Sequence, residues 1–195
     1  LTTLDVSNWN VSNATTLQSL FLNCNKLTEL DTSKWKTSNK LNRIDSMFQD
    51  CTSLKNIDLS NLDVSNVTDM SRTFANTYSL TNLDLSMWNT HNVQSLNNTF
   101  LNCGAENINV STWDTSNASD LEATFAGCKI ATLDLSNWNF DNVKTLSSTF
   151  NGCPNLETII KENWTTSNKL TNLLKTFVNC PKLKNIDISK WDTSN

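Results

Sequence analysis

The sequence repeats itself along its whole length with a period of 25 to 27 residues. The stretch LDLSNWNFDNVKTLSSTFNGC, residues 133–153, closely matches LDLSMWNTHNVQSLNNTFLNC, residues 83–103. The first apolar residue of the pattern falls at eight positions, which are Leu4, Leu30, Ile57, Leu83, Ile108, Leu133, Ile159 and Ile186. One repeat of this length cannot bury its apolar side alone, whereas stacked copies share a continuous core. The period therefore predicts a repeat solenoid with one turn per repeat.

The repeats leave no room for a linker or a second domain. We expect residues 1–195 to form a single solenoid of about 7.5 repeats. Because the sequence begins and ends inside a repeat, we expect it to be a fragment of a longer protein. The 27-residue repeats carry their extra residue in TSNKLNRI and TSNKLTNL, and the 25-residue repeats lose one in CGAENI and CKIATL. Length changes confined to two places predict loops there.

The LDLS segments predict short strands. In a strand at residues 132–136, Leu133 and Leu135 point inward, and Thr132, Asp134 and Ser136 point outward. Such strands, stacked in register, form a parallel sheet with about 4.8 Å between neighbouring turns.

The segment that follows each strand allows two interpretations. In DNVKTLSSTF, residues 141–150, Val143, Leu146 and Phe150 have helical spacing, and Asp141 could cap a first turn. The segment is short and rich in Ser and Thr, so a second short strand or a 3₁₀ turn is an equal alternative.

Aromatic and cysteine residues occupy fixed places in the repeat. All seven Trp share one place, which Leu62 takes in the third repeat. We expect this column to pack in the core, with each indole N–H bonded to a loop carbonyl, rather than to form a platform for sugars. The six Cys also share one place, so their side chains should point the same way as parallel rungs. A disulfide needs Cβ atoms that face each other about 3.8 Å apart, so we predict buried free thiols.

Composition and charge exclude several function classes. The Trp and Phe content argues against disorder. The net charge of −4 is spread along the chain without a basic patch, so we expect no nucleic-acid partner. No apolar run approaches the roughly 18 residues that a membrane span needs.

The titratable residues do not indicate catalysis. His91 is the only histidine, and we expect it in a surface loop. No pair of closely spaced cysteines and no Cys/His cluster indicates a metal. We therefore predict no enzyme activity and no cofactor. A column of Thr residues could suggest ice binding, but the Phe column beside it predicts that these Thr side chains are buried. These residues are Thr73, Thr99, Thr124, Thr149 and Thr176.

The outward positions of the strands are the candidate functional site. Asp recurs there, which could attract Ca²⁺ or could form a ladder of hydrogen bonds to backbone and Ser groups; we favour the ladder. Asn109 and Ile160 interrupt the Asp column. The candidate ligand-contact face comprises Asn82, Asp84, Ser86, Asn107, Asn109 and Asp134.

The consensus LDLSxWxTSNVxxLxxTFxxCxxL resembles the BspA-like leucine-rich repeats of bacterial surface proteins, in the form common in lactobacilli, related Gram-positive bacteria and mycoplasmas. The resemblance covers all 195 residues. It implies a right-handed solenoid of the leucine-rich-repeat type, exposed on the cell surface and often linked to adhesion, with no catalytic residues. The seventh repeat departs from the pattern with IIKENW, and the third carries Leu62 for Trp and Thr77 for Cys.

Two functions remain open at this point. The first is an extracellular interaction module that adheres to a host or matrix protein or glycan, favoured by irregular patches at residues 104–109 and 159–163. The second is a spacer that projects another domain from the cell surface, favoured by the near-uniform outward residues.

Overall fold

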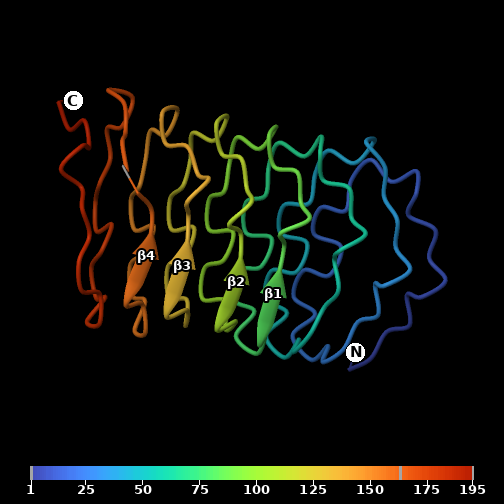
Figure 1. The fold of residues 1–195 in the computed structure, drawn as a ribbon. Helices are drawn as coiled ribbons and strands as arrows, with labels where there is room; N and C mark the ends of the chain where they lie inside the picture. Colours follow the sequence, from blue (N-terminus) through green and yellow to red (C-terminus); the bar gives the residue numbers. More distant parts are fainter. Residues whose placement is uncertain (1, 163, 195) are drawn as a thin grey trace.

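A computed structural model describes residues 2–162 and 164–194, so Asn163, the last residue of the second irregular patch, lies outside the described part with Leu1 and Asn195. Successive repeats lie side by side from the N-terminal to the C-terminal end (Figure 1). Backbone hydrogen bonds join each repeat to the next. The Leu17 N–H, for example, donates to the Arg43 carbonyl at 2.9 Å. This is the contact pattern of a repeat fold, in which each unit is stabilised by its neighbours.

Four short strands form on one side of the stack (Figure 1). They are β1 (Asn82–Asp84), β2 (Asn107–Asn109), β3 (Thr132–Asp134) and β4 (Thr158–Ile160). β1 pairs with β2 and β3 with β4, each in parallel. The registers match Leu83 to Ile108 and Leu133 to Ile159, which confirms short parallel strands stacked in register. The strands form two two-stranded sheets rather than one continuous sheet.

The predicted alternation along the strands is confirmed. Leu133 and Leu135 are fully buried, whereas Thr132 and Ser136 are exposed and Asp134 is half-buried. The inward side chains join one hydrophobic core that runs through the repeats. In β1, β2 and β3 the outward side chains are therefore the ones that a partner can reach, whereas the inward Ile159 of β4 is half-buried.

The helical interpretation of the segment after the strand is wrong. Within the described residues no helix forms, and residues 141–150 follow successive turns. Ser148 and Gly152 have φ of 57° and 73°, in the left-handed region that a right-handed helix excludes. Asp141 caps no helix; its backbone N–H donates to the side chain of Asn139. The second-strand alternative is closer, because Thr145 forms single parallel bridges to the repeats on both sides.

The turns exist because alternate backbone groups bond to the neighbouring repeat. The N–H groups of Leu146, Ser148, Phe150 and Gly152 donate to the carbonyls of Asn172, Leu174, Thr176 and Val178 at 2.7–3.0 Å. The intervening N–H groups close turns within the repeat, as Thr149 does on Leu146. A left-handed residue recurs twice in each repeat at the places of Ser148 and Gly152, and it turns the chain so that both sets of bonds can form.

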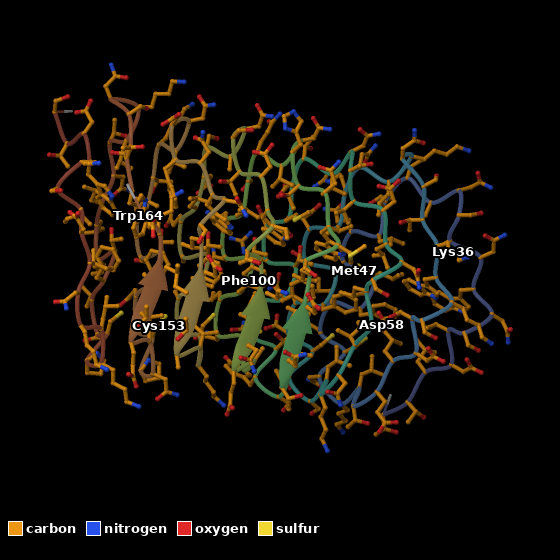
Figure 2. All side chains as sticks on the ribbon, in the orientation of Figure 1. Lys36, Met47, Asp58, Phe100, Cys153 and Trp164 are labelled. Atoms are coloured by element: carbon orange, nitrogen blue, oxygen red, sulfur yellow. The ribbon has the colours of Figure 1, made fainter. Side chains whose placement is uncertain are left out.

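Phe and Trp columns fill the core beside these turns. Figure 2 labels one member of each column, Phe100 and Trp164. The ring centroids of Phe100 and Phe125 lie 5.3 Å apart with an interplanar angle of 10°. Trp113 stacks on Trp138 at 6.0 Å and 7°. Trp113 Nε1 donates to the Leu85 carbonyl at 3.1 Å, as expected for a buried indole. The Trp column is therefore a core element in the middle repeats, although Trp9 at the N-terminal edge is 44% exposed.

Candidate functional site

The candidate ligand-contact face lies on the outer surface of the strands. Asn82 and Asp84 of β1, with Asn107 and Asn109 of β2, are exposed, and the parallel register places them in two columns. The two further members, Ser86 and Asp134, are half-buried. The structure thus brings all six residues onto one surface, which we call the strand face.

Each Asp of the strand face accepts a hydrogen bond from its own turn. Asp84 Oδ1 accepts from the Ser86 backbone N–H at 3.1 Å, and Asp134 Oδ1 from that of Ser136 at 2.9 Å. The same bond forms at Asp5, Asp31, Asp58 and Asp187. These hydrogen bonds stabilise the ionised carboxylate, so the pKa of Asp84 lies below its usual value, chiefly through the bonds from Ser86. The strand face therefore carries negative charge at neutral pH.

The interruptions of the Asp column have different effects. Asn109 keeps the ladder, because its Nδ2 donates to Asp84 Oδ1 at 3.0 Å and its Oδ1 accepts from the Ser111 hydroxyl at 3.0 Å. Ile160 offers no such group and is 41% exposed. The hydrogen-bonded interpretation of the column is confirmed. Within the described ranges, no group of three His, Cys, Asp or Glu side chains could hold a metal ion.

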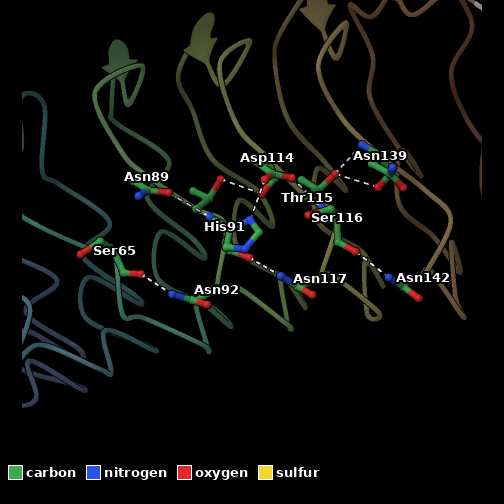
Figure 3. A network of polar contacts seen from close by, with 11 residues as sticks. Ser65, Asn89, His91, Asn92, Asp114, Thr115, Ser116, Asn117, Asn139 and Asn142 are labelled. Atoms are coloured by element: carbon green, nitrogen blue, oxygen red, sulfur yellow. Dashed lines mark hydrogen bonds and ion pairs between the residues drawn. The ribbon is translucent and has the colours of Figure 1, made fainter.

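A second polar surface, the Asn corner, uses its side chains to bind the preceding repeat (Figure 3). In four repeats, the Nδ2 atom of one Asn donates to a backbone carbonyl at 2.6–2.8 Å. The pairs are Asn66 with Asn39, Asn92 with Ser65, Asn117 with His91 and Asn142 with Ser116. These amides add side-chain links to the backbone bonds between repeats, so their N–H groups already have an acceptor within the protein.

His91 lies on the Asn corner, in the expected exposed position. Its Nδ1 lies 2.8 Å from Asp114 Oδ2 of the next repeat (Figure 3). This contact, before the bonds from Ser116, lowers the pKa of Asp114 below its usual value. Ser116 bonds to Asp114 and not to the imidazole, so the three residues do not have the arrangement of a catalytic triad. The pair is a link between repeats.

The cysteine column is buried and reduced, as the sequence predicts. All six cysteines are free, and those of the middle repeats are buried. Four of the thiols, those of Cys51, Cys128, Cys153 and Cys180, donate to the carbonyl of a Phe in the preceding repeat, as in Cys51 to Phe21 at 3.1 Å and Cys153 to Phe125 at 3.1 Å. Burial raises the pKa of both thiols to about 12, so neither is a thiolate at neutral pH.

The Thr column next to the Phe column is also buried. Thr99 Oγ1 donates to Met70 and Leu96 carbonyls at 3.0 and 2.8 Å, and Thr124 Oγ1 makes the equivalent two bonds. Since these hydroxyls are covered by protein, the column cannot present a surface to ice.

The seventh repeat holds a feature that sequence reasoning missed. Lys161 takes the inward place that Leu135 occupies in the preceding repeat, two residues after the register pair of Leu133 and Ile159. Its Nζ donates to the Ser136 and Trp138 carbonyls at 3.1 and 2.6 Å. Desolvation lowers its pKa. The signal was the spacing itself, since Lys161 follows Ile159 as Leu135 follows Leu133.

The described residues contain no helix that is both long and apolar enough to cross a membrane. The sequence matches the family described as "Mycoplasma protein of unknown function, DUF285" over residues 2–81, 42–164 and 119–195. The chain belongs to this family. The three matches overlap and cover the repeats from end to end, as expected when one repeated unit is matched in several registers. No curated protein and no solved structure matches the chain.

Proposed function

We propose that the chain is a right-handed solenoid of the BspA-like leucine-rich-repeat type. In this proposal it is displayed outside a bacterial cell as a non-catalytic interaction module that adheres to a host or matrix protein or glycan. The stacked repeats, the parallel strand pairs and membership of a repeat family described from Mycoplasma support the proposal. No cofactor takes part.

One observation carries the choice of surface. The polar side chains of the Asn corner, and the buried Cys and Thr columns, bond to neighbouring repeats. Asp134 of the strand face instead bonds within its own turn, to Ser136. Its outer side stays open to solvent, so a ligand can bind Asp134 without breaking a link between repeats. Asp84, by contrast, also accepts a bond from Asn109 of the next repeat.

The chemistry of the strand face defines the ligand class. Ionised carboxylates alternate with the amides of Asn82, Asn107 and Asn109. A surface of this kind favours a ligand that carries positive charge and many hydrogen-bonding groups. The contact should weaken with added salt, because the Debye length is about 8–10 Å near physiological ionic strength.

The test is a binding array of matrix proteins and glycans, probed with the native chain and with the double variant Asp84→Asn/Asp134→Asn. Asn keeps an oxygen that can accept the bond from the following Ser, as Asn109 already does at this place. The variant therefore removes charge while it preserves the turn. We expect binding to fall at least tenfold while the urea midpoint stays nearly unchanged.

The matched control is Asp141→Asn/Glu122→Gln, which removes the same charge at exposed positions away from the strands. It should bind like the native chain. Equal loss in both double variants would assign the effect to net charge, and unaffected binding in the strand-face variant would place the ligand elsewhere.

A spacer is the second candidate function. The regular hydrogen-bonded columns favour it, since a uniform surface suits a rod that holds another domain away from the cell. Deletion of residues 83–132, two whole repeats, would shorten such a rod by about 10 Å. If the native chain binds nothing on the array, and this deletion impairs presentation of a fused distal domain, the spacer function replaces adhesion.

A further inference from the structure

The interface between the third and fourth repeats lacks side-chain links that neighbouring interfaces contain. We call the contact between residues 57–64 and residues 83–90 the joint. Leu62 takes the Trp place here, so Trp88 has no Trp of the preceding repeat to stack on, whereas on its other side it stacks on Trp113 at 6.2 Å and 5°. Leu62 is buried but carries no indole N–H. The Trp column is therefore interrupted at the joint.

A polar link is missing at the same interface. Asn61, Thr112 and Asn137 hold one place in their repeats, directly before the Trp place. Each donates from its side chain to a Ser carbonyl of the preceding repeat at 2.7–3.0 Å. Met87 takes this place at the joint. Its side chain cannot donate a hydrogen bond and is 76% exposed.

A second polar link is missing two residues after the Trp place. Thr37, Thr90 and Thr115 stand there in other repeats, and each hydroxyl donates to a carbonyl of the following repeat at 2.8–3.2 Å. Val64 takes this place at the joint and has no hydroxyl. Three kinds of side-chain link that join neighbouring repeats elsewhere are therefore absent from one interface.

The strand side of the joint is also unpaired. Across the next interface β1 pairs with β2 along three residues. Across the joint, no bridge joins residues 57–64 to β1 in the described part of the chain. The remaining bonds on this side come from Thr81, whose N–H donates to the Lys55 carbonyl at 3.1 Å, and from Trp88 Nε1, which donates to the Leu59 carbonyl at 3.2 Å.

The turn side of the same interface keeps its bonds. The Phe74 N–H donates to the Thr99 carbonyl at 2.8 Å. The Phe74 ring stacks on Phe100 with centroids 5.7 Å apart and an interplanar angle of 1°. On the Asn corner, Asn92 Nδ2 donates to the Ser65 carbonyl at 2.8 Å (Figure 3). Links are thus absent on one side of the stack and intact on the other, which is the arrangement of a hinge.

We propose that the joint is a hinge built into the stack. The first three repeats swing away from the later ones about the turn side, and the strand side opens between Leu62 and Trp88. In a repeat protein each interface contributes separately to stability, so the interface with the fewest links opens first. The opening breaks the bonds of Thr81 and Trp88 and leaves the repeats on both sides folded. Such a hinge lets the stack bend under load without unfolding.

Hydrogen exchange measured by NMR on the whole chain tests the hinge. The Trp88 indole N–H is bonded across the joint, and it should exchange about tenfold faster than those of Trp113 and Trp138, which are bonded across the next two interfaces. The Phe74 backbone N–H is bonded across the turn side. It should exchange as slowly as the Phe100 N–H, which makes the equivalent bond one repeat later.

A repair variant restores two of the missing links. Val64→Thr/Met87→Asn introduces side chains that other repeats carry at these places, and it should slow exchange of the Trp88 indole toward the rates at the next two interfaces. The matched control is Val11→Thr/Lys34→Asn. It makes the same introductions between the first and second repeats and should leave the Trp88 rate unchanged.

Three results would overturn the proposal. Exchange of the Trp88 indole that is no faster than that of Trp113 would mean that the joint stays closed. Exchange of the Phe74 N–H that is as fast as that of the Trp88 indole would mean that the third repeat unfolds as a whole instead of swinging. Equal slowing by the repair and control variants, or no slowing by either, would separate the opening from the missing side chains.

Discussion

Replacement of Phe125 by Ala removes the centre of the Phe column. The side chain is fully buried and stacks on Phe100 at 5.3 Å and on Phe150 at 5.9 Å, with Trp138 at 5.7 Å beside it. Deletion of a buried Phe side chain costs about 3–5 kcal/mol of unfolding free energy. Because two stacked rings lose their partner at once, and each aromatic pair contributes about 0.5–1.5 kcal/mol, we expect the upper half of that range.

The end of the column provides the comparison. Phe177 is half-buried and has one Phe neighbour, Phe150, with Trp191 at 6.1 Å. Phe177→Ala should therefore cost about half as much as Phe125→Ala. Urea unfolding followed by far-UV circular dichroism measures both. Equal costs at the two positions, or an unchanged midpoint for Phe125→Ala, would refute the reasoning that stacked neighbours on both sides stabilise each ring.

Three further predictions concern thiols, glycines and acid. A thiol reagent should find six reactive groups after denaturation without reductant and few before, since Cys51 and Cys153 are buried with pKa values of about 12; fewer than six would indicate disulfides. Gly104→Ala should destabilise the fold by about 2–3 kcal/mol, because a Cβ at this position would lie 1.9 Å from the Tyr78 carbonyl oxygen. Gly152→Ala should cost about 1 kcal/mol, because Gly152 has φ +73° but its added Cβ would have its nearest neighbour at 3.9 Å. Thermal melts in which Gly152→Ala is the more destabilising change would contradict this packing. The carboxylates of Asp5, Asp31 and Asp84 have folded-state pKa values below the unfolded value of about 3.9, so their contribution to stability is present above that pH and is lost as pH falls through the folded values. A urea midpoint that rises below about pH 4 would contradict this sign.

The strands and the core columns could be predicted from the sequence because their pattern has a simple cause. Inward Leu133 and Leu135 alternate with outward Asp134, and a stacked sheet requires that alternation. The Trp and Cys columns followed from the period alone, since residues in one place of every repeat share one environment. The six residues of the strand face were placed outward by the same argument.

The turns between Trp and Cys could not be predicted in the same way. Their left-handed residues are Gly127, Gly152 or Asn in most repeats at one place, which is a usable signal. At the other place they include Arg72, Ala123 and Lys175, which give no local signal. Bonds to the neighbouring repeat select the conformation there, and those bonds exist only once the repeats are stacked.

The stacking of one repeat per layer underlies both candidate functions, and the length of the particle in solution tests it most directly. Small-angle X-ray scattering of the native chain and of the variant without residues 83–132 measures the change in maximum dimension. Stacking predicts a rod that is shorter by about 10 Å with an unchanged cross-section, at roughly 4.8 Å per repeat. An unchanged maximum dimension, or a reduction spread equally over length and cross-section, would contradict it.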